Sequence, residues 1–364
     1  MQWNLLHQRC WSNMVRHRIV PKLCAMLIAT GILWGAICRP LNADELLAVK
    51  PTTRLLAPEI KDQDDMCVWV DPSQPERSTV IASDKTAGAI FVYDLQGQLL
   101  QQIAVNKPGN IDVRQGVKLG ERVLDLVVVN QRGGGFKLRV FGVDRQTRRL
   151  EPLDNGDLVT GPNYGGCLYH SAKTGKLFFV CTSDAGTVEQ YELQAIADGK
   201  IGGKKVRAWP VGKCEGAVAD DEEAVVYIAE EKKGVWRFPA EPEEPATGTL
   251  IVKVGEHGLK GDVEGLCVYR GSDRSGYLLV SDQGSNRFSL YDRRPPHGFI
   301  GHFSIEGAED SDGIDLSIAD FGSGFPKGFF ACHTGRVPRA VLITPWQDIA
   351  SQLPIKASVS STSP

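Results

Sequence analysis

The chain has 364 residues, a formal net charge of −3 and a hydrophobic content of 42%. This length suffices for one large closed β domain or two ordinary domains. The small net charge excludes a long-range field that would attract nucleic acid or an anionic membrane, so any electrostatic function must be local. We therefore expect neither nucleic acid nor a membrane as a stable partner.

Residues 1–43 have the pattern of a signal peptide. Several basic residues precede an apolar run of 15 residues from Leu23 to Ile37, and Leu41-Asn42-Ala43 resembles a small-residue cleavage site. The run is short for a membrane span, which usually needs about 20 residues. We predict export to the periplasm or the extracellular space, and the alternative is an uncleaved membrane anchor.

Short alternating β patterns then recur with a period of about fifty residues. In each unit an aromatic residue stands inside such a pattern, at Tyr93, Phe141, Tyr191, Phe238 and Tyr291. The gaps are 48, 50, 47 and 53 residues, and a sixth unit would end near Leu342. This period fits a propeller blade of four strands. Residues 44–352 are predicted to form an all-β, six-bladed β-propeller with four-stranded antiparallel blades.

Four of the units show all four strands in their sequence. The first reads CVWVDP, STVIAS, AIFVYDL and LLQQIAV, whereas the second shows only LDLVVVNQ and KLRVFGVD. Residues 44–60 carry few strand signals and are predicted to be a leader. The Ser/Thr-rich end, residues 353–364, is predicted to be a disordered tail.

Six cysteines follow the predicted signal peptide: Cys67, Cys167, Cys181, Cys214, Cys267 and Cys332. An even number in an exported chain could form disulfides, with 15 possible pairings. Several of them stand inside strand patterns, where a buried free thiol is at least as good an interpretation. Without a C-x-x-C motif, their spacing argues against a zinc site.

Acidic residues gather in four clusters at the starts and ends of predicted strands. They are Asp62-Gln63-Asp64-Asp65, Glu215 to Glu231, Asp262-Val263-Glu264 and Asp310 to Asp315. A propeller brings such loops to one mouth, where clustered acids repel unless a hard cation such as Ca²⁺ neutralises them. Solvated turn acids are the alternative, which we favour for Asp220 to Glu223. For Asp262 and Glu264, two acids on one side of a strand start, a solvated face is less natural.

Several longer stretches resemble the β-propeller phytases. They include DDMCVWVDP, NIDVR, YGGCLYHSAKTGK, the run from GKKVRAWPVGKCEGAVADD to GVWRFPAEP, GDVEGLCVY, GYLLVSDQGSNRFSLYDR and DGIDLSIADFG. The matches occur in order from Asp64 to Trp346. The resemblance implies a six-bladed propeller that uses several Ca²⁺ ions to hydrolyse phytate, myo-inositol hexakisphosphate, as a 3-phytase-like phosphoric monoester hydrolase.

The resemblance also implies roles for individual residues. Metal ligands are expected at Asp64, Asp65, Glu215, Glu231, Asp262, Glu264, Gln283 and Asp312. Phosphate contacts are expected from Lys85, Arg114, Arg132 and Tyr164. Glu215, Asp262 and Lys85 are the expected catalytic residues. Bound cations would stabilise the phosphoryl oxygens and activate water as the nucleophile. The implied substrate is a small phosphorylated molecule, and we expect a monomer.

The cationic rim of the site is thinner than the family pattern. Where the family often has two successive lysines, this chain keeps only Lys85, and the turn Ser183-Asp184-Ala185-Gly186 lacks the family's lysine. We therefore expect a weaker phytate preference or a compensating cation nearby, such as Lys213 or Arg287. Two other functions stay open: a calcium-dependent propeller lactonase or esterase, and a non-catalytic binding platform.

Overall fold

The computed structural model describes residues 48–355, and these form a six-bladed β-propeller of antiparallel sheets. The predicted signal peptide and residues 356–364 of the predicted tail lie outside the described residues. Within residues 48–355, no helix has the length and apolar character that crossing a membrane requires. The fold class predicted from the fifty-residue period is confirmed, because Tyr93, Phe141, Tyr191, Phe238 and Tyr291 all lie on the third strand of a blade.

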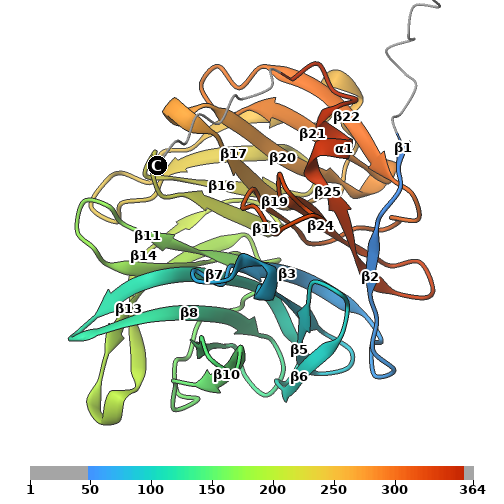
Figure 1. Ribbon diagram of the computed structural model, residues 1–364. Helices are drawn as coiled ribbons and strands as arrows, with labels where there is room; N and C mark the ends of the chain where they lie inside the picture. The colour runs from blue at the N-terminus through green and yellow to red at the C-terminus, as the bar shows by residue number, and fades with distance from the viewer. Residues whose placement is uncertain (1–47, 356–364) are drawn as a thin grey trace, which may run out of the picture. The chain divides into compact units, whose positions relative to one another are not determined.

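The first three blades run in chain order (Figure 1). Blade one contains β3 (Gln63–Trp69), β4 (Thr79–Asp84), β5 (Ala89–Asp94) and β6 (Leu99–Ala104). Blade two contains β7 (Pro108–Leu119), β8 (Arg122–Gln131), β9 (Lys137–Asp144) and β10 (Arg149–Pro152). Blade three contains β11 (Gly166–His170), β12 (Leu177–Cys181), β13 (Thr187–Ala195) and β14 (Ile201–Pro210).

The next three blades complete the ring. Blade four contains β15 (Cys214–Asp220), β16 (Val225–Glu230), β17 (Gly234–Pro239) and β18 (Thr249–Lys253). Blade five contains β19 (Val263–Arg270), β20 (Gly276–Asp282), β21 (Arg287–Asp292), β22 (Phe299–Ile305) and the added strand β1 (Ala48–Val49). Blade six contains β23 (Ile314–Ser317), β24 (Phe329–Thr334), β25 (Ala340–Pro345) and β2 (Thr53–Leu55).

Within residues 48–355, helical structure is confined to short pieces between strands and after the last strand. These are η1 (Pro75–Arg77), η2 (Ala197–Gly199), η3 (Glu256–Gly258), η4 (Ser272–Arg274), η5 (Gln283–Ser285) and α1 (Trp346–Ala350).

The prediction of a leader at residues 44–60 is wrong for two short segments. β1 pairs in parallel with β22, and β2 pairs antiparallel with β25. Figure 1 shows the blue β2 beside the red β25, so the first and last parts of the propeller share one sheet. This pairing supplies the fourth strand of blade six and ties the first part of the propeller to its last strand.

Because β2 completes blade six, we expect one of its side chains to contribute strongly to stability. Leu55 is fully buried in the apolar cluster between blades six and one, whereas the neighbouring Leu56 is 44% exposed. We expect Leu55→Ala to lower the free energy of unfolding by about 2–5 kcal/mol because it leaves a cavity. Leu56→Ala is the matched control and should stay within about 0.5 kcal/mol of the wild type. Denaturant unfolding measures both, and equal effects would contradict this role of β2.

The hydrophobic core is divided among the blade boundaries. The described residues form six apolar clusters, and each cluster joins two neighbouring sheets around the ring. The six cysteines of the described residues are all buried with free thiols, which confirms that interpretation over disulfides. Because the sheets pack face to face, the innermost strands β3, β7, β11, β15, β19 and β23 contact one another in a closed circle.

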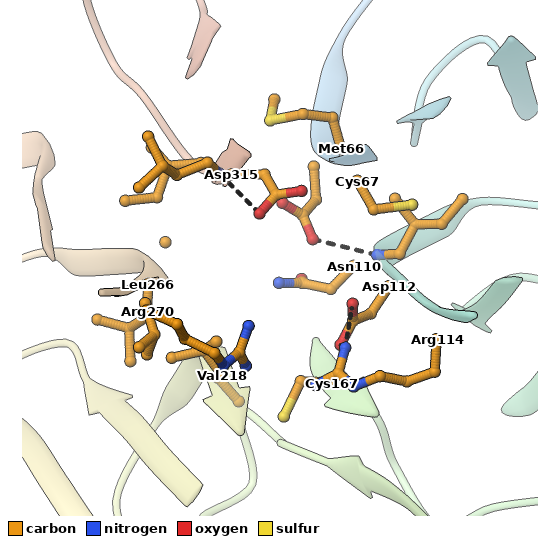
Figure 2. Close-up of a pocket in the computed structure, with 18 residues that line it drawn as sticks. Met66, Cys67, Asn110, Asp112, Arg114, Cys167, Val218, Leu266, Arg270 and Asp315 are labelled. Carbon is orange, nitrogen blue, oxygen red and sulfur yellow. Dashed lines mark hydrogen bonds and ion pairs between the residues drawn. The ribbon is translucent and has the colours of Figure 1, made fainter. Parts of the chain in front are cut away.

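The innermost strands enclose a polar cavity of about 70 Å³. Figure 2 shows the side chains of Asp112, Arg270 and Asp315 directed toward it. Three carboxylates here link neighbouring blades by accepting backbone hydrogen bonds: Asp315 from Val68 N–H (2.9 Å), Asp65 from Ile111 N–H (3.1 Å) and Asp112 from Leu168 N–H (2.8 Å). The polar inner strands are therefore joined by side chains as well as by the apolar clusters.

We expect the Asp315 carboxyl group at this cavity to make the free energy of unfolding depend on pH. Burial, followed by the nearby Asp112 carboxylate, raises the pKa of Asp315 to about 7. Since this folded pKa lies above the usual value near 4, the stabilising contribution of the proton is complete in acid and is lost as pH rises through 7. Asp315→Asn keeps the acceptor for Val68 N–H. We expect the free energy of unfolding of Asp315→Asn, measured relative to the wild type, to be about 1–3 kcal/mol higher at pH 8 than at pH 5.

Denaturant unfolding at the two pH values measures this change. Asp320→Asn is the control, because Asp320 is an exposed aspartate of the same blade. A wild-type-to-Asp315→Asn difference that is the same at pH 5 and pH 8 would contradict the assignment.

Candidate active site

The predicted site residues lie where the innermost strands begin. Asp64 and Asp65 open β3, Glu215 opens β15 and Glu264 opens β19, while Tyr164 and Asp312 directly precede β11 and β23. Because all innermost strands start at the same end of the ring, these side chains gather at one mouth of the propeller. Asp262 directly precedes β19, and four other positions directly follow the second strand of a blade: Lys85, Arg132, Glu231 and Gln283.

Local irregularities of the strands aim these side chains. The register shifts between Gln63 and Met66, between Cys214 and Ala217, and between Val263 and Leu266. Asp64, Glu215 and Glu264 stand inside these three β-bulges. A bulge bends the strand and re-aims its side chains, and it is common beside active sites. A fourth bulge, at the start of β7, holds Asn110, which the sequence alone did not single out.

Glycines that follow the site residues let neighbouring strands approach closely. A Cβ atom on Gly216 would come within 1.9 Å of the Glu264 carbonyl oxygen, and one on Gly313 would come within 2.0 Å of Asp65 Oδ1. Only glycine fits such contacts. The Glu-Gly and Asp-Gly pairs at strand starts are therefore part of the construction of the mouth.

One side of the mouth is organised around the fully buried Asp64. Lys85 Nζ lies 2.8 Å from Asp64 Oδ1 and 2.9 Å from Asp312 Oδ2, so it bridges two carboxylates from blades one and six. Arg132 Nη2 lies 2.9 Å from Asp64 Oδ2. Gln283 Nε2 donates to Asp312 Oδ1 at 2.5 Å. The predicted residues Asp64, Lys85, Arg132, Gln283 and Asp312 thus form one connected network.

The other side is organised around Tyr164 and Glu231. The Tyr164 side chain lies beside the Glu215 carboxylate, and the centre of its ring lies 5.0 Å from the Arg132 guanidinium carbon and 5.3 Å from Lys213 Nζ. Lys213 Nζ is 2.8 Å from Glu231 Oε1. Asp262 joins this side through its backbone, because its N–H donates to the Glu231 carbonyl at 2.8 Å.

Asp262 differs from the expectation for its motif. It precedes β19 in a left-handed conformation (φ 64°), and its side chain is 43% exposed and paired with Lys232 at 2.5 Å. Glu264 lies two residues further on and is buried inside the bulge. The two acids therefore occupy different levels of the mouth, with Asp262 at the rim and Glu264 within.

Arg114 lies apart from the other predicted phosphate contacts. It follows Asn110 by four residues on β7, roughly 13 Å further along an extended strand. Its guanidinium lines the central cavity, where it binds Asp112 (2.9 Å), Asp221 (2.8 Å) and the Leu168 carbonyl (2.7 Å), as Figure 2 shows for Asp112. These partners accept hydrogen bonds from the Nε, Nη1 and Nη2 atoms of Arg114. Its role as a phosphate ligand stays a prediction that the placement does not favour.

Asp220, the first of the predicted solvated turn acids, is also placed differently. It is fully buried, where it pairs with the equally buried guanidinium of Arg293. The expectation of a solvated acid is therefore wrong for Asp220. It forms an ion pair between blades four and five.

The electrostatics of the mouth favour added positive charge. Burial, followed by the neighbouring carboxylates Asp64 and Glu264, raises the pKa of Glu215 well above its usual range. Burial and Glu231 do the same to the pKa of Glu264. Burial raises the pKa of Asp312 to about 6 although Lys85 opposes the shift. Ionising these acids together is costly unless cations lie among them.

The chemistry of the predicted metal ligands suits a hard cation. All the predicted ligands offer oxygen atoms, which Ca²⁺ prefers. Glu264 is 6% exposed, and its Oε2 atom has no hydrogen-bond partner among the described residues. Within residues 48–355, however, no three histidine, cysteine, aspartate or glutamate side chains converge closely enough to form a ready metal site. The acids Asp64, Glu231 and Asp262 are instead paired with lysine or arginine.

Fold and site together define a six-bladed β-propeller whose mouth pairs acidic with cationic side chains. The family model for Phytase matches residues 27–355, and the chain belongs to this family. It is a phosphoric monoester hydrolase. It is 31% identical over 361 residues to the 3-phytase of Bacillus subtilis (strain 168), with 92% of this chain and 94% of that protein covered.

A solved structure supports the fold alone. The calcium-binding protein regucalcin from Agrobacterium tumefaciens superposes with a TM-score of 0.51 at 14% identity, covering 82% of this chain and 97% of that one.

Proposed function

We propose that this protein is a calcium-dependent phosphomonoesterase that hydrolyses phytate. One observation carries the proposal: the mouth gathers six carboxylates, at Asp64, Glu215, Glu231, Asp262, Glu264 and Asp312, against four cationic side chains, at Lys85, Arg132, Lys213 and Lys232. Such an excess of negative charge would repel a phosphorylated substrate. Bound cations would reverse that repulsion, and family membership supplies the matching reaction.

Calcium would be held by the carboxylates of the mouth together with Gln283. When bound, it would supply positive charge to the phosphoryl oxygens and increase the acidity of water. The ion pairs Lys85–Asp64 and Arg132–Asp64 hold two cationic side chains in place, which suits binding and orienting a phosphate. Glu215, which lies beside Tyr164, would orient the attacking water and accept its proton.

A substrate comparison tests this proposal. The purified chain, supplied with calcium, is given phytate, 4-nitrophenyl phosphate and an uncharged lactone. We expect phosphate release from both phosphate esters and no lactone hydrolysis. Lactone hydrolysis without phosphate release would favour the propeller lactonase. A folded chain inactive on all three would favour the binding platform. Export and a monomeric state accompany the proposal as predictions for cell fractionation and light scattering.

A further inference from the structure

We propose that a pocket at the end of blade five opposite the mouth binds a small organic cation, an ammonium group carried on an apolar body. The pocket has a volume of about 500 Å³ and shares no lining residue with the mouth. It lies at the other end of the ring because β19 begins at the mouth, whereas the pocket is lined by Tyr269, near the end of that strand. A cavity of this size suits one small molecule.

A row of three side chains forms one wall of this pocket. In the register of blade five, Tyr269 of β19 lies opposite Tyr277 of β20, and Tyr277 lies opposite Asp292 of β21. Residues that are directly paired point to the same face of a sheet, so the row brings two aromatic rings and a carboxylate together. The centres of the two tyrosine rings are 5.3 Å apart, and their planes are inclined at 46°.

Another part of the wall is apolar. It is formed by Ile300 of β22 and by Pro354 and Ile355, which follow α1. Ile300 and Ile355 also pack against the apolar cluster between blades five and six. The apolar body of a ligand can therefore leave water on this side of the pocket while its charged end reaches the row of tyrosines and aspartate.

The charges of the pocket favour a cation over a neutral or anionic ligand. Two carboxylates line it, at Asp273 and Asp292, and among the described residues its single cationic lining side chain is Arg294. Arg294 is 59% exposed, and its Nε lies 4.0 Å from Asp292 Oδ1, which is beyond hydrogen-bond distance. Within residues 48–355, the Asp273 carboxylate takes part in no hydrogen bond or ion pair. Both carboxylates can therefore accept from an ammonium group.

The aromatic ring of Tyr277 adds to this preference. Burial, followed by the nearby Tyr269 and Asp292, raises the pKa of Tyr277, so its side chain stays a neutral phenol. The face of such a ring attracts an ammonium group. A ligand held between Tyr277 and Asp292 would gain this attraction together with a charge-assisted hydrogen bond.

Three probes that share one ring and differ in charge test the proposal: benzylammonium, benzyl alcohol and benzoate. Their binding to the whole chain is measured by ligand-observed NMR titration, with calcium included to compete for the acids of the mouth. We expect benzylammonium to bind about tenfold more tightly than benzyl alcohol, and benzoate to bind most weakly. Equal affinities for the three probes would overturn the proposal. So would tighter binding of glucose than of benzylammonium, because the pocket would then be a sugar site.

A matched pair of variants places the binding in this pocket. Asp273 and Asp198 are both exposed, and each is the middle residue of a short 3₁₀ segment in a left-handed conformation, with φ of 54° and 58°. Asp198 belongs to blade three and does not line the pocket. We expect Asp273→Asn to weaken benzylammonium binding about threefold and Asp198→Asn to leave it unchanged. Equal effects of the two substitutions would contradict the site.

Two further variants should change the affinity in opposite directions. Asp292→Asn keeps an acceptor for the Arg294 N–H, which lies 2.9 Å from Asp292 Oδ1, and should weaken benzylammonium binding about fivefold. Arg294→Met removes the competing positive charge and should tighten the binding about twofold. A variant that had merely lost its fold would not bind more tightly. Unchanged affinity in Asp292→Asn, or weaker binding in Arg294→Met, would overturn the proposal.

Discussion

Replacing Glu215 by glutamine is expected to reduce phosphate release from phytate by about 100- to 10,000-fold, the range that a proton-transferring group contributes. Glu215 stands in the β15 bulge, beside Tyr164 and almost fully buried. Glutamine keeps the shape of the side chain but can neither accept a proton nor supply negative charge to a cation. The loss should appear in kcat.

Stability separates this effect from damage to the fold. Burial and neighbouring acids already disfavour the ionised form of Glu215, since they raise its pKa. A neutral isostere should therefore leave the melting temperature unchanged or raise it. Glu223→Gln, in the turn after the same strand, is the control and should keep full activity. Wild-type rates in Glu215→Gln, with the fold intact, would remove Glu215 from the mechanism.

The largest effect on stability is expected at Arg293. This side chain is fully buried between blades four and five, where its guanidinium binds both Asp220 oxygens, at 2.5 and 2.7 Å, and Glu222 at 2.6 Å. Arg293→Met leaves the buried Asp220 carboxylate without its main partner. We expect the free energy of unfolding to fall by about 3–5 kcal/mol.

The neighbouring residue provides the control for this experiment. Arg294 is 59% exposed and lies 4.0 Å from Asp292, so Arg294→Met should change stability by at most about 1 kcal/mol. Adding Asp220→Asn to Arg293→Met removes the uncompensated charge and should restore part of the loss. A destabilisation of Arg293→Met no greater than that of Arg294→Met would contradict the buried ion pair.

The blades could be predicted because their middle strands are apolar and alternate regularly. AIFVYDL and VEQYEL give the period directly, since the third strand of each blade packs between two neighbouring sheets. β7 was missed because it lines the polar cavity and carries Asp112 and Arg114 instead of an apolar run. β2 was missed because three residues, Thr53–Leu55, carry too little pattern, and their partner β25 lies almost three hundred residues away.

The sequence predicts which residues form the site better than it predicts how these residues are arranged. Acids followed by glycine at strand starts, as in Glu215-Gly216 and Glu264-Gly265, mark the mouth in the sequence. Which cation pairs with which acid depends on contacts between blades, as for Lys85 with Asp312, and sequence spacing does not encode such contacts. Arg114 shows the same limit, because four residues along a strand separate the mouth from the central cavity.

Inorganic phosphate release from phytate, first with calcium and then with excess chelator, tests the account most directly. We predict release with calcium, its loss in chelator, and its recovery when calcium is restored. Release that continues unchanged in excess chelator would contradict the account, because the crowded acids of the mouth would then be catalysing the reaction without a metal ion.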